Sequence, residues 1–522
     1  MGRGRPPRRA RRHRGPRRDG PARDGGGRRR RVTVEVATGR AGEAAVDALV
    51  VGLPGRGPRL PAALAAMDRR LAGLLSAVLD GEKFQGKPGQ VTHLYTGGRL
   101  PAARLVVAGL GDEGTLDAVR RAAAAAVRRA RELGARTVAT ELLGRGASVA
   151  DRAQALVEGA LLGSYTFERY KRERADRAVE RLRVVVPAAQ AAEARRGARR
   201  GEIFARATWF ARDLVNGPAN DVHPTYLAEV AVEIAPDGRL RARVFDRDEC
   251  AQMGMGALLG VAAGSAQPPR FIHLTYTPAG RPRRRIALIG KGVTFDAGGL
   301  DLKSAESMAR MKSDMSGAAA VLAVLRALPE LAPPVEVHGL VAAVENMPSG
   351  SALRPGDVLR AMNGTTIEVG NTDAEGRLTL ADAICYALDR VKPDEIIDLA
   401  TLTGACVVAL GPLCAGLMAN DQALADRLLR AAAHAGERLW QLPLIEEYRE
   451  HLKSDVADLN NVGPRGGGAI TAALFLREFA GATPWAHLDI AGPAFSEKDL
   501  PLAPRGATGV AVRTLLTYLT AR

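Results

Sequence analysis

Three short stretches of the chain place acidic side chains beside glycine or other small residues. Their sequences are GKGVTFDAGGLDLK at 290–303, MKSDMSGAA at 311–319 and NTDAEGRL at 371–378. Each stretch lies at or just after a predicted strand, and loops at the carboxyl ends of strands form the ligand crevice of open α/β sheets. We therefore expect one shared cluster of carboxylates, formed by Asp296, Asp314, Asp373 and Glu375.

Carboxylates that share a cleft repel one another strongly unless positive charge lies among them. Divalent metal ions would supply that charge, and a pair of ions about 3.5–4 Å apart can activate a bridging water as a nucleophile. Asp373 and Glu375 are two residues apart, so one turn can direct both toward the same ions. A lone Asp in a glycine-rich turn usually only forms the turn, but the coincidence of these carboxylates at strand ends favours a two-metal hydrolytic site.

The lysines give an independent argument from composition. The chain has nine Lys against 65 Arg, yet three of the nine lie between 291 and 312. An Arg cannot lose its proton in a protein, whereas a Lys beside cations can become the neutral amine that a metal ligand requires. Lys291 fits that role, Lys303 could stay charged and stabilise an oxyanion, and Arg377 offers a planar fork for a small oxyanion. We predict that Lys312 is only a solvated charge.

The elements that must position these residues alternate between strands and helices, which is typical of α/β domains with a largely parallel sheet. In the second half we predict a helix over 316–328 and strands over 286–292, 335–346, 395–404 and 485–492. In the first half we predict a helix over 117–133 and strands over 32–39, 47–53, 104–111, 137–143 and 181–187.

A chain of 522 residues is too long for one core, because single cores stop growing at roughly 250–300 residues. We expect two α/β domains, a smaller N-terminal one and a larger C-terminal catalytic one whose central sheet is mixed and mainly parallel. The predicted limits are a tail at 1–31, the N-terminal domain at 32–187, a linking helix at 188–215 and the catalytic domain at 216–522.

The positive charge of the chain is concentrated in its first residues. The formal net charge is +17, and residues 1–31, with 14 Arg and two Asp, account for +12 of it, which leaves 17 − 12 = +5 for the rest. This Arg, Gly and Pro-rich tail has no apolar periodicity and is predicted to be disordered. Three interpretations stay open: it binds nucleic acid through phosphate neutralisation, it is a plain solvated tail, or it precedes a true start near Val32.

Cysteine content and hydropathy bear on the cellular location. Four scattered cysteines without a CxxC pair form no disulfide scaffold, so a reducing cytoplasm fits best. The basic start is not followed by the apolar segment of a signal peptide. The apolar stretch from Leu399 to Ala419 contains three glycines and a proline, and we interpret it as a buried strand and loop rather than a membrane span.

With these residues in place, the chain resembles the leucyl (cytosol) aminopeptidase family. NTDAEGRL resembles the signature octapeptide of that family, and GKGVTFDAGG with the following LK and MKSDMSGAA resembles its other metal-binding stretch. Further similarity lies in LVNGPANDVHPTYLAE at 214–229, in AITAALFLREF and in WAHLDIAGPA. The resemblance is strong over residues 200–515 and weak over 32–186. The chain departs from the family pattern at Ala297 and Ser304, neither of which is a ligand position.

The resemblance implies a metal-dependent aminopeptidase that releases Leu and other apolar N-terminal residues from peptides. It implies that Lys291, Asp296, Asp314 and Glu375 hold one divalent ion and that Asp296, Asp373 and Glu375 hold the other, with Asp373 using its side chain and its main-chain carbonyl. Lys303 and Arg377 would be the catalytic pair, and Arg377 would position a bicarbonate as general base. The family uses zinc, manganese, magnesium or cobalt, forms homohexamers, and includes members that bind DNA.

Rival functions remain. A two-metal phosphoesterase would use a similar cluster but usually recruits several His ligands, whereas His338 and His487 lie inside predicted apolar strands and are expected to be satisfied core residues. A nucleic-acid-binding protein that acts through residues 1–31, with or without peptidase activity, is the alternative from another class. A catalytically inactive relative is disfavoured because every ligand position is filled.

Overall fold

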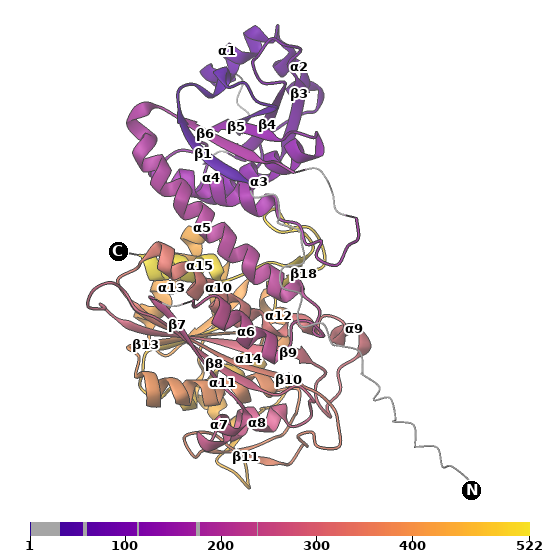
Figure 1. Ribbon diagram of the computed structural model, residues 1–522, viewed down its shortest axis with the longest axis vertical. Coiled ribbons are helices and arrows are strands. Elements are labelled where there is room, and N and C mark those ends of the chain that lie inside the picture. The colour runs from indigo at the N-terminus through magenta and orange to yellow at the C-terminus, as the bar shows by residue number, and fades with distance from the viewer. Residues whose placement is uncertain (2–31, 56–59, 112–113, 174–177, 237, 522) are drawn as a thin grey trace.

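The computed structural model describes residues 1, 32–55, 60–111, 114–173, 178–236 and 238–521. The Arg-rich tail, to which the sequence assigns disorder and a potential nucleic-acid contact, lies outside the described residues. Figure 1 shows two α/β units stacked along the long axis of the molecule, with one long helix running beside both. The expectation of two α/β domains with a smaller N-terminal one is confirmed.

The N-terminal unit holds a six-stranded sheet in the described part of the chain, in the order β1-β6-β5-β2-β4-β3. All neighbouring strands pair in parallel except β3 and β4. The strands are β1 (Thr33–Thr38), β2 (Ala48–Pro54), β3 (Val91–Tyr95), β4 (Arg104–Gly111), β5 (Thr137–Glu141) and β6 (Arg181–Val186). One face is covered by α3 (Leu116–Glu132) and α4 (Val149–Gly163), and the other by α1 (Ala62–Arg70) and α2 (Leu74–Gly81).

The C-terminal unit holds an eight-stranded sheet among the described residues, in the order β15-β14-β17-β13-β9-β10-β8-β7. Its centre, from β17 to β10, is parallel, while β14 against β17 and the edge strands β8 and β7 pair antiparallel. The mixed, mainly parallel sheet is therefore confirmed. Its strands are β7 (Leu240–Phe245), β8 (Arg270–Tyr276), β9 (Arg285–Asp296), β10 (Glu336–Asn346), β13 (Glu395–Ala400), β14 (Ala415–Ala419), β15 (Leu439–Gln441) and β17 (Trp485–Asp489).

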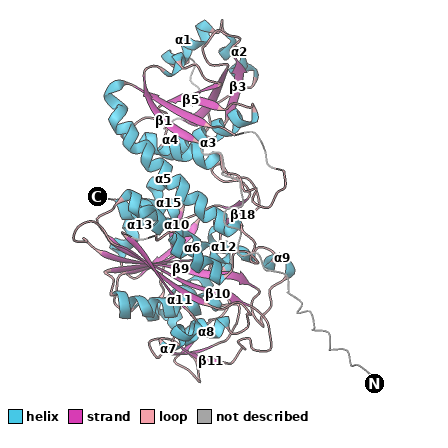
Figure 2. Cartoon of the chain, viewed as in Figure 1, coloured by secondary structure: helices cyan, strands magenta, loops and turns pink. Residues whose placement is uncertain are grey.

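Helices cover both faces of this sheet (Figure 2). Because its central strands are buried on both sides, their sequences are continuous apolar runs. One face packs against α5 (Ala191–Asn216), α6 (Pro224–Glu233), α10 (Ser316–Leu331), α13 (Gln422–Ala435) and α15 (Val512–Thr520). The other face packs against α7 (Arg247–Gln252), α8 (Gly256–Ala262), α11 (Glu375–Tyr386) and α14 (Gly468–Ala480). The functional side chains must therefore emerge at an end of the sheet, not on its faces.

Shorter elements complete the fold. A small sheet pairs β11 (Val358–Arg360), β12 (Thr366–Glu368) and β16 (Leu459–Asn460), and a second pairs β18 (Phe495–Ser496) with β19 (Gly506–Ala507). The remaining short helices are α9 (Ala305–Met308), α12 (Gly404–Leu410), η1 (Ala41–Glu43), η2 (Ala188–Gln190), η3 (Met311–Met315), η4 (Ala387–Val391) and η5 (Glu446–Leu452). Among the described residues, no helix combines the length and the apolar character that crossing a membrane requires.

Helix α5 links the two units and contacts both. A Cβ added at Gly197 or Gly201 would lie 2.1 Å and 2.7 Å from carbonyl oxygens of α4, so these glycines allow the two helices to pack backbone against backbone. The predicted helix over 188–215 begins instead with the single turn η2 and then continues as α5 to Asn216. We propose the predicted limits of 32–187, 188–215 and 216–522 as the units of the chain.

The first turn of α10 packs equally closely on the central strands. A Cβ added at Gly317 would lie 2.1 Å from the carbonyl oxygen of Leu399 on β13 and 2.9 Å from the amide nitrogen of Lys291 on β9. This contact sets how near the segment before α10, which carries Asp314, can come to the end of the sheet. A glycine is required there because backbone atoms cannot move aside as a flexible side chain can.

We predict that Gly317→Ala lowers the free energy of unfolding by about 1–3 kcal/mol, the usual cost of overpacking a tight core. The measurement is urea denaturation followed by circular dichroism. Gly350→Ala is the matched control, because a Cβ at Gly350 would meet nothing within 4 Å, and it should change stability by less than about 0.5 kcal/mol. Equal stability of the two variants would contradict the close packing of α10.

Candidate functional site

The central strand β9 supplies two of the predicted residues, Lys291 and Asp296, and an irregularity lets both reach one site. Residues five apart on a regular strand face opposite sides of the sheet. The pairing of β9 with β10 shifts register between the partners of Val293 and Phe295, so that Thr294 is the extra residue of a bulge. A bulge redirects the side chains that follow it, and Asp296 therefore ends on the same side as Lys291. The sequence predicted the strand only as far as residue 292 and did not indicate the bulge.

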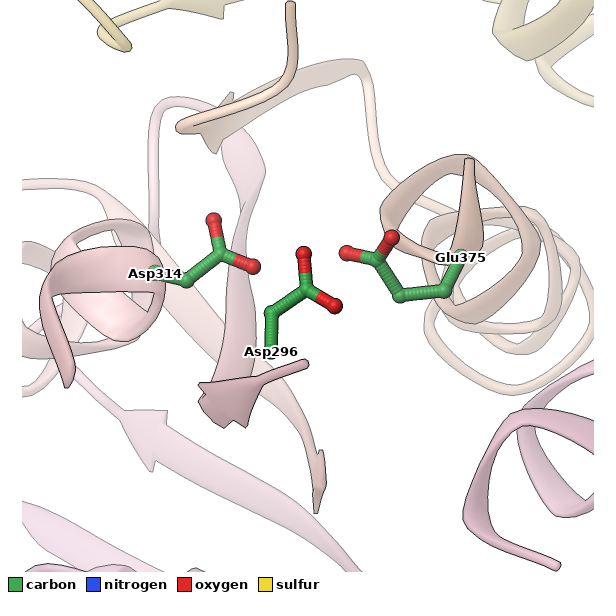
Figure 3. A group of neighbouring side chains, drawn as sticks. All are labelled: Asp296, Asp314 and Glu375. Carbon is green, nitrogen blue, oxygen red and sulfur yellow. The ribbon is translucent and has the colours of Figure 1, made fainter. Parts of the chain in front are cut away.

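Two other segments bring acidic side chains to the same place. Asp314 lies in η3, directly before α10, and Glu375 is the first residue of α11. Both are buried, and so is Asp296. Oxygen atoms of these three carboxylates lie within 4.8 Å of one another, and Figure 3 shows all three side chains pointing toward a common centre. Segments that are far apart in the sequence thus bring these three side chains together.

Lys291 lies between two of these carboxylates. Its Nζ is 2.8 Å from Asp314 Oδ2 and 2.7 Å from Glu375 Oε1, and it donates a hydrogen bond of 3.1 Å to the carbonyl oxygen of Thr401. Burial alone would lower the pKa of this ammonium, but the charges of Asp314, Glu375 and Asp296 outweigh burial and raise it. In the metal-free protein Lys291 is therefore a cation that compensates the acidic cluster.

Lys303 performs the same compensation on the other side of the cluster. Its Nζ is 2.8 Å from Asp296 Oδ2 and forms a short ion pair with Asp373 Oδ1. Its pKa is also raised, since the neighbouring carboxylates outweigh burial. Asp373, the fourth predicted carboxylate, is half-buried, and it joins the cluster through this lysine.

The donor set fits divalent cations. Asp314 Oδ2, Asp373 Oδ1 and Glu375 Oε1 are buried, and the partner that the described part of the chain offers each of them is a lysine ammonium. Burial raises the pKa of the Glu375 and Asp373 carboxyls, and the negative charge of Asp296 raises both further. Carboxylate oxygens are the ligands that Mg²⁺ and Mn²⁺ prefer, and an added amine suits Zn²⁺ as well.

Arg377 lies two residues after Glu375, in the first turn of α11, and it is buried. Its Nη1 donates a hydrogen bond of 2.7 Å to the carbonyl oxygen of Asn461. Its Nε is buried and donates to no acceptor within the described ranges. Burial lowers the pKa of the guanidinium to about 10, so it remains charged at neutral pH. A buried cation with a free donor edge is suited to a small oxyanion.

Several polar residues that support the cluster were not predicted from the sequence. Asn346, the last residue of β10, donates from Nδ2 to Asp296 Oδ1 at 2.9 Å. The hydroxyl of Thr401 donates to Asp314 Oδ1 at 2.6 Å. Asp301 accepts hydrogen bonds from the amide and the hydroxyl of Thr372. A signal was present in the sequence, because Asn346 ends β10 and Thr401 directly follows β13, and both strands pair with β9. However, one sequence does not reveal which strands are neighbours.

Two predictions about single residues need correction. Lys312 is not a solvated charge, because it is half-buried and its Nζ donates a hydrogen bond of 2.8 Å to the carbonyl oxygen of Asn216. His487 is only partly satisfied: its Nδ1 lies 2.5 Å from Asp398 Oδ1, whereas its buried Nε2 has no hydrogen-bond partner in the described part of the chain. His338 bonds through both ring nitrogens, as expected of a core histidine.

Comparison with known families gives one consistent result over most of the chain. Residues 209–516 match the catalytic domain of the cytosol aminopeptidase family, and residues 50–174 match the N-terminal domain of the same family. Similar proteins include the probable cytosol aminopeptidase of Synechococcus sp. (strain JA-3-3Ab), 50% identical over 89% of this chain and 92% of the relative. The probable cytosol aminopeptidase of Geobacter sp. (strain M21) is 46% identical over 93% of this chain and 99% of its own length.

Solved structures agree with the sequence relatives. The bottromycin maturation enzyme BotP in complex with Mn is 40% identical, with a TM-score of 0.81 over 91% of this chain and 99% of that one. A mutant of tomato leucine aminopeptidase is 39% identical, with a TM-score of 0.86 over 94% of this chain and 96% of that one.

We predict that Lys291→Met lowers the free energy of unfolding of the metal-free protein by about 3 kcal/mol, because removing one partner leaves buried carboxylates uncompensated. Urea denaturation in the presence of EDTA measures this. Lys498→Met is the control, since Lys498 is exposed and distant from the cluster in sequence. A metal-free Lys291→Met protein as stable as the control would show that the ammonium does not compensate the cluster.

Proposed function

The chain belongs to the cytosol aminopeptidase family and is a peptidase, and on this basis we propose that it releases N-terminal amino acids from peptides at the cluster around Asp296. The observation that carries the proposal is the convergence of buried carboxylates whose oxygens lie within 4.8 Å of one another, beside the lysine ammoniums. The proposed preference is for Leu and other apolar N-terminal residues.

We propose that two divalent cations, manganese or zinc, occupy this cluster. Lys291, Asp296, Asp314 and Glu375 would hold one cation, and Asp296, Asp373 and Glu375 would hold the other, with Asp373 also using its main-chain carbonyl. The buried carboxylate oxygens, which the described residues balance only with lysine ammoniums, support this assignment, and the Mn complex of BotP favours manganese. When bound, the cations would polarise the scissile carbonyl and activate a water, the chemistry of two-metal hydrolases. Lys291 must then give up its proton at Nζ to act as a ligand.

Side chains of this protein would stabilise the oxyanion and hold the general base. Lys303, held by Asp296 and Asp373 at the edge of the cluster, would keep its ammonium and stabilise the developing oxyanion of the peptide carbonyl. Arg377 would hold a bicarbonate that supplies a general base, and its free Nε supports this role. The segment 400–404 would offer backbone groups to the substrate, since it adjoins Asp314 and Lys291 through Thr401.

The wider setting is proposed from the family. Peptides would be the substrates, the assembly would be a homo-oligomer, hexameric by resemblance, and the location would be the cytoplasm, as the names of the relatives indicate. The alternative of nucleic-acid binding rests on residues 1–31 and gains no support from the part of the chain that the structure describes.

We predict that chelation abolishes hydrolysis of Leu-p-nitroanilide and that Mn²⁺ restores it. Glu375→Ala, which removes a ligand shared by both proposed cations, should lower kcat/KM by at least ~10³-fold even with excess Mn²⁺. Asp389→Ala is the matched control, because Asp389 is exposed near the other end of the same helical segment and pairs only with Arg390 among the described residues. Activity that survives chelation, or a Glu375→Ala enzyme as active as the control, would refute the metal assignment.

We predict that Lys291→Arg weakens metal binding although it keeps the positive charge. The guanidinium cannot lose its proton, and it is too large for the site, because a Cβ at Gly376 would already lie 2.6 Å from Lys291 Cε. Metal content after dialysis, measured by atomic absorption, should fall from two ions per chain toward none. A fully loaded and active Lys291→Arg enzyme would contradict the neutral-amine role.

A further inference from the structure

Asn461 is a fully buried side chain that makes all of its hydrogen bonds to the main chain of one loop. Its Oδ1 accepts from the amides of Gly370 and Asn371 at 2.8 and 3.2 Å. Its Nδ2 donates to the carbonyl oxygens of Asn371 and Ala374 at 2.8 and 3.4 Å. Amides can only donate and carbonyls can only accept, so the orientation of the Asn461 carboxamide is fixed by its partners.

The topology explains how Asn461 reaches this loop. Strands β12 and β16 are parallel neighbours, with Glu368 opposite Asn460, and both end at the same edge. The chain after β12 becomes the loop 370–374, and the chain after β16 continues as Asn461, whose amide donates to the carbonyl oxygen of Glu368. The side chain of Asn461 therefore replaces the ladder hydrogen bonds that the loop would have made as a continued strand.

The same loop carries or borders the groups proposed to do the chemistry. Asp373 lies within it, Glu375 follows it as the first residue of α11, and Arg377 comes two residues later. Asn461 also binds Arg377 directly, because its carbonyl oxygen accepts from Nη1 at 2.7 Å. Asn461 thus contacts both the loop that carries or adjoins two proposed ligands and the nearby guanidinium.

We propose that Asn461 is a positioning residue that holds the main chain of 370–374 and the Arg377 guanidinium in the geometry that cation binding and catalysis require. This rests on the proposed function. Asp301 and Asn346 hold Thr372, in the middle of the loop, from the other side. The loop is therefore clamped between two sets of polar side chains, and loss of Asn461 frees the side that faces Arg377.

The test is a titration of metal-stripped full-length protein with Mn²⁺ by isothermal calorimetry, together with kcat and KM for Leu-p-nitroanilide as the Mn²⁺ concentration is raised. Asn461→Ala should raise the Kd for Mn²⁺ by about 10–100-fold, as loss of a residue that orients metal ligands usually does. Raising the Mn²⁺ concentration should recover most of the lost activity, which a residue with a merely structural role would not show.

Asn460→Ala is the matched control, because Asn460 is the preceding residue and its side chain bonds to Glu368 and Val462 rather than to the loop. The Kd of Asn460→Ala for Mn²⁺ should stay within about twofold of the wild-type value, a change that the loss of an orienting residue exceeds.

If Asn461→Ala does not fold, the same titration is made with Asn461→Ser, which is a milder change. Folded Asn461 variants that bind Mn²⁺ like the control would overturn the proposal, as would failure of both variants to fold. Wild-type protein that binds neither Mn²⁺ nor Zn²⁺ would refute the proposed function itself, whereas normal wild-type binding with unaffected variants would refute only the positioning role.

Discussion

Mutual repulsion among buried carboxylates is the constraint on which the structure of this site depends. Asp296, Asp314 and Glu375 are each almost completely removed from water, and their oxygens lie within 4.8 Å of one another. Such an arrangement is stable only when cations lie among the oxygens. Lys291 and Lys303 meet this requirement, since each contacts two of the four acidic residues. The lysines therefore help to hold the acidic side chains together.

The main chain around the cluster is arranged to permit these short distances. Gly317 and Gly376 let helix and side-chain atoms approach to distances that a Cβ would forbid, and the bulge at Thr294 turns Asp296 toward Lys291. Polar side chains then satisfy the loops that have no strand partner, as Asn461 does for 370–374. Rigid supports of this kind hold catalytic groups to the narrow tolerance that metal chemistry requires.

The N-terminal unit is tied to the catalytic unit by buried charge as well as by helix packing. Arg120 and Glu158 form an ion pair of 2.6 Å, and both side chains are 1% exposed. Arg513, on α15 of the catalytic unit, brings a further guanidinium to 3.8 Å from Glu158. The buried carboxylate of Glu158 is shared between the two units. Opening the interface would remove Arg513 from it and leave Glu158 with one cationic partner fewer, so separation of the units is disfavoured.

The amino-acid sequence alone is enough to predict the two-unit α/β architecture, the strands that lead to the site and the residue types able to do the chemistry. The architecture and the strands follow from hydrophobic periodicity, which is a local property. The residue types follow in part from lysine usage, because three of the nine Lys lie between 291 and 312 in a chain with 65 Arg. Tertiary structure alone decided which strands are neighbours, and therefore that Asn346, Thr401 and Asn461 support the cluster. It also decided that Lys312 is bonded rather than solvated and that His487 is only partly satisfied. Such contacts join residues far apart in the sequence, for example Lys291 and Thr401, which are 110 positions apart, and the local pattern along one chain does not reveal them.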